Sequence, residues 1–316
     1  MNYHSIVLPT RSQPDTIVAI FLLKKFGKEV FPGVLNAETK ILSVLPEGKK
    51  PEDMEKEGYI LIDIGGGMFD HHGKVPETCA SILIAKHLGI FENPALKKMI
   101  DYAERDDRFG KGTVSEDMLD RAFGLSGLIA ALNKKYSSEP IKVIDIVLPL
   151  IEAHFEEENK RFTELPEELE KAKKENKVQV LDIKQKKNTL KVILIESNNV
   201  GMPGFLRSSF GGKFDVVVQR GGSGHVNILT RPMKRPDIRL LAGVIRATES
   251  QITNNTAIRP ESIEAQKSGR SDIAPNWYFD PATNSLQNGG VNPNSVVKTV
   301  IPWELFPQII EMGLSF

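Results

Sequence analysis

The sequence predicts an α/β protein with a parallel-sheet N-terminal domain, a helical connector and a smaller α+β C-terminal domain. Residues 5–8 and 59–64 form short apolar runs, which are typical of strands buried between helices in a parallel sheet. After a long helical and then highly charged stretch, the pattern changes to one of strands. We therefore place an N-terminal domain at residues 1–150, a helical linker at 151–177 and a C-terminal domain at 178–316.

The elements of the N-terminal domain follow from proline, glycine and apolar periodicity. The first strand stops at Pro9, and Pro14 with Asp15 begins a helix that ends near Gly27. Proline and an acidic residue favour the first turn of a helix, and glycine favours its end. A further strand is expected over residues 41–45. Helical periodicity then predicts helices over residues 78–88, 95–105, 115–132 and 141–161.

The C-terminal domain is predicted to be rich in strands. They are expected over residues 178–183, 190–196, 214–219 and 226–230. The glycine-rich break at 221–224 predicts a hairpin between the last two strands. A helix over 238–251, an ordered loop to about residue 276 and a final helix over 303–313 complete the prediction.

Composition limits the functions that the chain supports. Its 316 residues suit two domains, and its 41 acidic residues balance 41 basic ones. No overall charge therefore draws it onto nucleic acid or an anionic membrane, although a local basic cleft would suffice for a nuclease. Cys79 is the single cysteine, so no intramolecular disulfide forms and a reducing compartment is expected. Apolar runs are too short to span a membrane, and we expect a cytoplasmic protein.

The strongest chemical motif is Asp70-His71-His72, which follows the buried strand ending at Asp63. Side chains at the carboxyl end of such a strand face the crevice where open α/β sheets bind ligands. Carboxylates and imidazoles together suit a divalent metal ion. Asp63 and His71 are therefore candidate metal ligands, while Asp70 is expected to orient a histidine without binding the metal itself. An ordinary surface turn with incidental histidines is the alternative interpretation.

Four segments resemble motifs of the DHH phosphoesterase superfamily. Residues 58–63 and 69–73 resemble its second and third motifs, and residues 11–15 and 102–107 resemble its first and fourth. The superfamily includes RecJ-like exonucleases, nano-RNA phosphodiesterases and manganese pyrophosphatases. The glycines before Asp70 are similar to those of the melanocyte-proliferating-gene-related hydrolases. The resemblance covers about the first 110 residues.

The resemblance implies a metal site and also shows where this sequence departs from the family. The metal ligands that it implies are Asp15, Asp63, His71 and Asp106. In the fourth motif Asp106 is preferred to Asp107, and the implied ion is Mn²⁺ or Mg²⁺. Arg11 replaces a histidine of the first motif and Ile17 replaces an aspartate. We therefore expect fewer ions than the usual two, with the Arg11 guanidinium contacting a phosphate instead.

The activity that the resemblance implies is metal-dependent hydrolysis of phosphodiester or phosphoanhydride bonds in a nucleotide or short oligonucleotide. Water activated by the metal is the expected nucleophile, and the catalytic residues are Asp63, His71 and His72. The expected substrate-binding residues are Arg11, His72, Arg220, Gly222, Ser223 and His225. The last four belong to a segment similar to the glycine-rich signature of the DHH-associated domain, whose backbone N–H groups face an anion. An ordinary hairpin turn is the alternative.

Two other functions are consistent with the sequence. Because its first motif is altered, the chain could be a catalytically degraded binding protein for nucleic acid or nucleotides. Residues 63–70 also resemble the phosphate loop of actin-like phosphotransferases, although that fold needs a second such loop. The expected partner is a phosphate-containing small molecule or a short single-stranded nucleic acid. No membrane partner is expected, and oligomerisation is left open.

Overall fold

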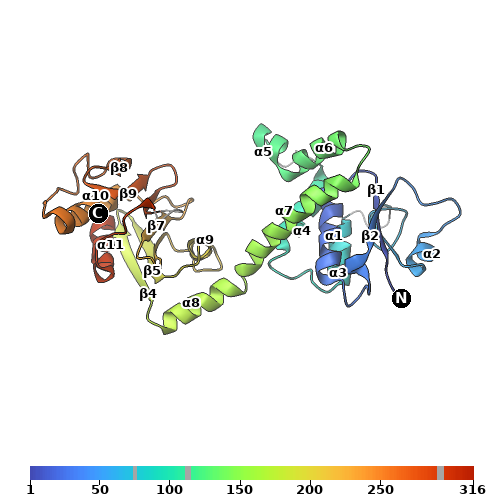
Figure 1. The fold of residues 1–316 in the computed structure, drawn as a ribbon, viewed down its shortest axis with the longest axis horizontal. Coiled ribbons are helices and arrows are strands. Elements are labelled where there is room, and N and C mark those ends of the chain that lie inside the picture. Colours follow the sequence, from blue (N-terminus) through green and yellow to red (C-terminus); the bar gives the residue numbers. More distant parts are fainter. Residues whose placement is uncertain (74–76, 111–114, 290–294) are drawn as a thin grey trace. The chain divides into compact units, whose positions relative to one another are not determined.

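The computed structural model describes residues 1–73, 77–110, 115–289 and 295–316, and it divides into two compact units. The first unit spans Met1–Phe162 and the second Thr163–Phe316 (Figure 1). Helix α7 (Ile141–Lys160) runs through residue 150, so the first unit continues beyond the end predicted for the N-terminal domain. Helix α8 (Glu164–Lys174) lies in the predicted linker and belongs to the second unit.

A three-stranded parallel sheet lies in the first unit, as the apolar runs predict. Strand β1 (Ser5–Pro9) is central, between β2 (Glu38–Leu42) and β3 (Tyr59–Leu61). Both pairings are parallel. The carboxyl ends of β1 and β3 therefore lie at the same edge of the sheet, where α/β proteins bind their ligands.

Helix α1 (Pro14–Phe26) forms the centre of the first core. Every residue from Pro14 to Leu23 is buried, because α3, α4, α6 and α7 pack around this helix. The unit also contains η1 (Val34–Asn36), α2 (Pro51–Lys56), α3 (Ala80–His87), α4 (Lys97–Phe109), α5 (Met118–Phe123) and α6 (Leu125–Lys135). The single helix predicted over 115–132 is wrong, because the extended backbone of Gly124 ends α5 and begins α6.

The second unit contains a seven-stranded mixed sheet in the order β4-β5-β6-β7-β10-β9-β8. Its strands are β4 (Val178–Gln185), β5 (Asn188–Glu196), β6 (Val216–Arg220), β7 (Val226–Thr230), β8 (Gly269–Ser271), β9 (Ala274–Asp280) and β10 (Ser285–Asn288). Strands β5 and β6 are parallel, and the other neighbours are antiparallel. The predicted hairpin is confirmed, because β6 and β7 pair across residues 221–224. Helices of this unit include α9 (Met202–Arg207), α10 (Arg239–Asn254) and α11 (Phe306–Leu314), with a short 3-10 helix at Trp303–Leu305.

The ordered loop predicted to about residue 276 is wrong in its last part. Strand β8 and the start of β9 lie there. Trp277 and Phe279 are buried, whereas Tyr278 between them is 45% exposed, which is the alternation of a strand with one face on the core. The prolines and asparagines before Trp277 conceal this short alternation in the sequence.

Two buried charged residues of α10 hold this region in place. The guanidinium of Arg246 donates hydrogen bonds to the backbone carbonyls of Ala265, Lys267, Gly269 and Trp277. The carboxylate of Glu249 accepts hydrogen bonds from the side chains of Asn276, Trp277 and Thr299 and from the backbone N–H of Val300. Buried charges are tolerated when they are hydrogen-bonded in this way. The network therefore explains why the irregular segment before β8 has a fixed path.

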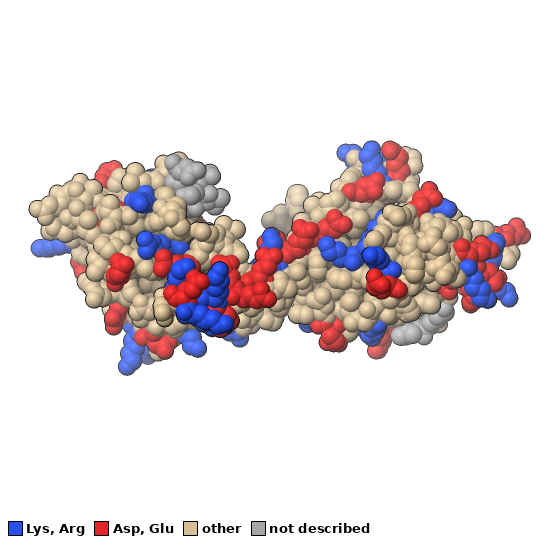
Figure 2. Space-filling model, turned by 60° about the horizontal axis from the view of Figure 1, so that its bottom comes forward, with Lys and Arg blue, Asp and Glu red and all other residues tan. Residues whose placement is uncertain are grey.

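Both signs of charge occur on each unit in the face drawn in Figure 2. This mixture agrees with the equal numbers of acidic and basic residues in the sequence. Within the described ranges, we find no helix with the length and apolar character needed to cross a bilayer.

Candidate metal centre

A tight loop after β3 brings Asp63 close to the two histidines. The chain leaves the strand at Asp63, whose φ of 54° lies in the left-handed region. Gly65 and Gly66 also have positive φ, which glycine adopts without strain. The loop closes on itself because the Asp63 N–H donates to the Phe69 carbonyl and the Asp70 N–H donates to the Gly67 carbonyl. The loop therefore brings His71 back to the carboxyl end of β3, beside Asp63.

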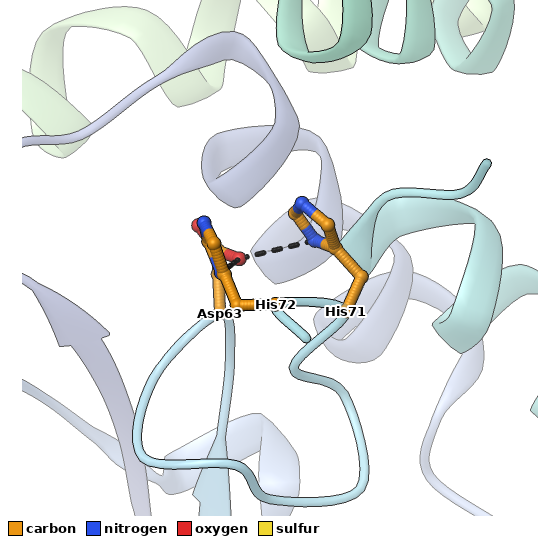
Figure 3. Close-up of side chains that lie close together, drawn as sticks. All are labelled: Asp63, His71 and His72. Atoms are coloured by element: carbon orange, nitrogen blue, oxygen red, sulfur yellow. Dashed lines mark ion pairs between the residues drawn. The ribbon is translucent and has the colours of Figure 1, made fainter. Parts of the chain in front are cut away.

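Asp63, His71 and His72 form a compact cluster (Figure 3). Oδ1 of Asp63 lies 3.2 Å from Nδ1 of His71 and 3.1 Å from Nδ1 of His72. The two imidazole rings are stacked, with centroids 4.4 Å apart. One ligand atom from each residue lies within 4.8 Å of the others, a spacing that suits a single shared ion. The side chain of Asp63 is buried, and that of His72 is 67% exposed.

Helix α4 adds a second carboxylate to the cluster. Oδ2 of Asp107 lies 3.2 Å from Nε2 of His71, so His71 stands between Asp63 and Asp107. The sequence favours Asp106 at this position, but the structure places Asp107 against His71. Asp106 lines a separate small cavity with Tyr102 and Arg105, and its buried Oδ2 makes no hydrogen bond within the described residues.

Asp15 is buried near the cluster but already has partners. Its two carboxylate oxygens accept hydrogen bonds from the backbone N–H groups of Ala80, at 2.9 Å, and Ser81, at 2.8 Å. Both groups belong to the first turn of α3, so Asp15 caps that helix from a distant part of the chain. Its charge still raises the pKa of Asp63 and of Asp107. Asp15 therefore contributes negative charge to the site besides holding two helices together.

Burial and neighbouring negative charges disfavour the ionised form of the carboxylates in this cluster. Burial is the main cause that raises the pKa of Asp63 to about 7. The charge of His72 opposes this rise, and the charges of Asp15, Asp107 and Asp70 contribute to it. Burial, followed by the charge of Asp15, also raises the pKa of Asp107, against the opposing effect of the histidines. Several carboxylates sharing a buried space cannot all ionise easily without a cation.

Asp70 orients His72 rather than joining the cluster. One oxygen of Asp70 accepts from the backbone N–H of His72 and lies 3.0 Å from its Nδ1, and the other accepts from the N–H of Gly66. Burial works against the charge of Asp70, but these hydrogen bonds outweigh it and lower its pKa. Burial would likewise lower the pKa of His72, but the hydrogen bond to Asp70 and the nearby carboxylates raise it. His72 therefore stays protonated to a higher pH than an ordinary histidine does.

The substrate-binding residues predicted in the glycine-rich segment lie in the second unit and have local partners. The Arg220 guanidinium is 3.6 Å from Glu196 and stacks over the ring of Trp303. The Gly222 N–H donates to Asn198. Nδ1 of His225 lies 3.0 Å from Ser223 Oγ, and its Nε2 lies 2.8 Å from the Val296 carbonyl.

Arg11, the remaining predicted phosphate contact, is an exposed side chain in the first unit. It lies just after β1, and it lines a cavity with Ser12 and Lys134. Sequence reasoning did not single out Ser12 or Lys134. The signal for Lys134 is weak, because it is one of two adjacent lysines in the last turn of α6, where basic residues are common.

No family model matches the chain, and no curated protein matches it. Among solved structures, it is similar to an uncharacterized protein from Helicobacter pylori G27, with 10% identity, a TM-score of 0.26 and 99% of each chain covered. It is also similar to the DHH domain of a protein described as a member of a ribosomal protein family, with 12% identity, a TM-score of 0.21 and 78% of each chain covered. At these TM-scores neither likeness supports an argument about this chain.

Proposed function

We propose that this chain is a metal-dependent phosphoesterase of the DHH type that hydrolyses phosphodiester or phosphoanhydride bonds of a nucleotide or short oligonucleotide. The observation that carries the proposal is the contact of His71 with both Asp63 and Asp107. These side chains come from a loop at the carboxyl edge of a parallel sheet and from the last turn of α4. The proposed ion is Mn²⁺ or Mg²⁺, bound by Asp63 and by Nδ1 of His71, while Asp107 holds the other ring nitrogen of His71.

Two buried atoms of the cluster support a cation between them. Asp63 Oδ1 and His71 Nδ1 are 3.2 Å apart, and neither makes a hydrogen bond within the described part of the chain. Leaving such an atom unpaired costs about 1–3 kcal/mol. A divalent ion would satisfy both atoms, because carboxylate oxygen and imidazole nitrogen are ordinary ligands of Mn²⁺. It would also reduce the repulsion between Asp63, Asp107 and Asp15 that raises the pKa of the first two.

The residues of the chain have distinct tasks in this proposal. Asp63 and His71 hold the ion, Asp107 orients the ring of His71 through Nε2, and Asp15 adds negative charge nearby. A divalent ion in such a site lowers the pKa of water and thereby supplies the nucleophile for phosphoester hydrolysis. His72 is exposed, and Asp70 fixes its ring and helps to keep it protonated, so it can donate a hydrogen bond to a phosphate oxygen of the substrate.

Metal content and turnover, measured on the same preparation, test the proposal. The full-length chain is incubated with Mn²⁺, desalted, and its metal content is measured by mass spectrometry. It is then assayed on short single-stranded oligonucleotides, bis-p-nitrophenyl phosphate and pyrophosphate. We expect bound metal and turnover in the wild type, and loss of both in His71→Ala. His154→Ala is the matched control, because it removes an exposed histidine of α7 outside the cluster.

Three results would count against parts of the proposal. A wild type with neither bound metal nor turnover would show that the metal-dependent activity is wrong. Full activity in His71→Ala would show that the site is misassigned. Bound metal without turnover would favour the second candidate, a binding protein for nucleotides or nucleic acid. Arg11 in place of the family histidine favours that candidate, as does the engagement of both Asp15 oxygens with α3.

A further inference from the structure

A cavity of about 670 Å³ lies in the first unit beside the amino-terminal end of α1. We call it the Arg11 cavity. Its volume is within the range of small-molecule sites, roughly 300–1,000 Å³. The walls come from the segment between β1 and α1 and from the last turns of α6 with the residues that follow. The polar side chains among them include Arg11, Ser12, Asn133, Lys134, Tyr136 and Ser137.

The charge of the Arg11 cavity is positive. Arg11 and Lys134 line it, and no acidic residue does among those that the structure describes. Among the described residues, neither Arg11 nor Lys134 forms an ion pair with a carboxylate, so their charge is available to a ligand. Lys135 lies against the ring of Tyr136, at 5.2 Å from its centroid, and adds to the positive potential nearby. Lys142 lies 4.7 Å from the same centroid but is paired with Glu139 at 3.6 Å. A ligand with negative charge is therefore favoured over a neutral one.

Ser12 forms a buried part of the cavity wall. It is 1% exposed, and its hydroxyl makes no hydrogen bond among the described residues. A buried hydroxyl without a partner is uncommon, because its desolvation costs about 1–3 kcal/mol. The wall is fixed, since the Asn133 side-chain amide donates to the Ser12 carbonyl at 2.8 Å. The positive end of the α1 dipole lies directly after this segment.

We propose that the Arg11 cavity binds a phosphate group of a nucleotide or short oligonucleotide, with Arg11 and Lys134 as its contacts. The inference rests on the proposed function, since it gives that substrate a second anchoring point. Arg11 follows β1 and Asp63 follows β3, and these strands are parallel neighbours. The cavity and the candidate metal centre thus lie on the same edge of one sheet. A substrate whose phosphate groups are separated by a nucleoside suits this arrangement better than inorganic pyrophosphate, whose two phosphate groups share one oxygen.

Binding without metal separates this site from the candidate metal centre. The full-length chain in EDTA is titrated calorimetrically with inorganic phosphate, with adenosine 5′-monophosphate and with a dinucleotide bearing a 5′-phosphate. We expect the wild type to bind the nucleotides, and Arg11→Gln and Lys134→Gln each to weaken binding by about tenfold or more, as expected for loss of a charge-assisted hydrogen bond. Lys28→Gln is the matched control, because Lys28 is exposed and follows the opposite end of α1.

The outcomes separate this inference from the proposed function. His71→Ala should keep nucleotide binding in EDTA while losing Mn²⁺. Arg11→Gln and Lys134→Gln should weaken nucleotide binding and leave Mn²⁺ binding unchanged. No nucleotide binding by the wild type in EDTA, or equal weakening by Lys28→Gln and Arg11→Gln, would overturn the phosphate site. Failure of Mn²⁺ binding alone would overturn the proposed function and leave the Arg11 cavity as a nucleotide site.

Discussion

His71 and Asp107 approach each other to 3.2 Å through Nε2 and Oδ2, although one comes from the loop after β3 and the other from α4. This contact joins the carboxyl edge of the sheet to a helix, and it gives His71 a carboxylate on each side. The helix that carries Asp107 is therefore part of the candidate metal centre.

The first prediction compares the two adjacent aspartates of α4. Asp107→Asn should lower Mn²⁺ affinity by roughly 10–100-fold, the range found when a supporting or ligating group of a metal site is lost. Asp106→Asn should change the affinity far less, because Asp106 has no contact with the cluster among the described residues. Calorimetric titration with Mn²⁺ measures both. An equal loss in the two variants would mean that Asp106 supports the metal centre as strongly as Asp107 does.

Asp70→Asn should loosen the loop and lower the pKa of His72. Asparagine has one acceptor oxygen, so it cannot keep the hydrogen bonds from Gly66 and from the backbone and ring of His72 together. Loss of one of them should cost about 1–3 kcal/mol. Amide hydrogen exchange in β1 and β3 measures the stability, and NMR titration of the imidazole measures the pKa.

The control for Asp70→Asn is Asp145→Asn, an exposed position of α7. It should leave both hydrogen exchange and the His72 titration as in the wild type. If the pKa of His72 stays unchanged in Asp70→Asn, then Asp63 and Asp107 alone maintain its charge.

The metal-free protein should become less stable as the pH rises. In the folded state the pKa of Asp63 is raised from 3.8 to about 7, so between these values the folded chain holds a proton that the unfolded chain has lost. The resulting contribution to stability is complete below about pH 4 and is lost as the pH rises through about 7. The raised pKa of Asp107 acts in the same direction. Hydrogen exchange of the β1 amides in EDTA at several pH values, corrected for intrinsic rates, measures this trend.

Asp63→Asn provides the comparison for the pH dependence. An amide does not titrate, so the slope of stability against pH should become shallower between about pH 4 and pH 7, the interval between the unfolded and folded pKa values of Asp63. A variant with the full wild-type slope would show that Asp63 is already ionised in the metal-free fold.

Glu249→Ala should destabilise the second unit selectively. The carboxylate accepts four hydrogen bonds, and removing it leaves buried donors such as Trp277 Nε1 unpaired. We expect a loss of about 3–5 kcal/mol, as for a broken buried charged network. Trp277 and Trp303, the two tryptophans of the chain, both belong to the second unit, so tryptophan fluorescence in urea follows this unit alone.

Glu261→Ala, at an exposed position, should leave the urea midpoint of the fluorescence unchanged. Mn²⁺ binding should persist in Glu249→Ala, because the candidate metal centre belongs to the first unit. Equal midpoints in Glu249→Ala and the wild type would show that the network contributes specificity of packing rather than stability.

The sequence predicts the parallel sheet because a strand buried on both faces has a continuous apolar run that few other structures share. It also predicts that Asp63 and His71 meet, since glycines follow the strand end and the histidines come soon after. It cannot choose between Asp106 and Asp107. Met99, Ile100 and Ala103 are the buried positions of α4, and helical spacing places both aspartates close to that face. One residue turns a helix by about 100°, so the choice depends on how α4 packs.

The sequence also does not reveal that Asp15 caps α3. Nothing in residues 78–82 indicates that the first turn of α3 takes its acceptor from a residue far away in the chain. The Arg11 cavity is hidden for the same reason, because residues 10–13 and 130–140 line it together only after α6 packs against α1. Contacts between distant segments depend on tertiary packing, which periodicity does not encode.

The positive φ of Asp63 restricts which substitutions can test its charge. Aspartate and asparagine enter the left-handed region more readily than other non-glycine residues, whereas alanine or a β-branched residue would be strained there. Asparagine therefore removes the charge and keeps the turn, while alanine would change both. The backbone at the end of β3 thus accepts a narrow set of residues before any ligand is considered, and within that set aspartate is the one that carries a negative charge.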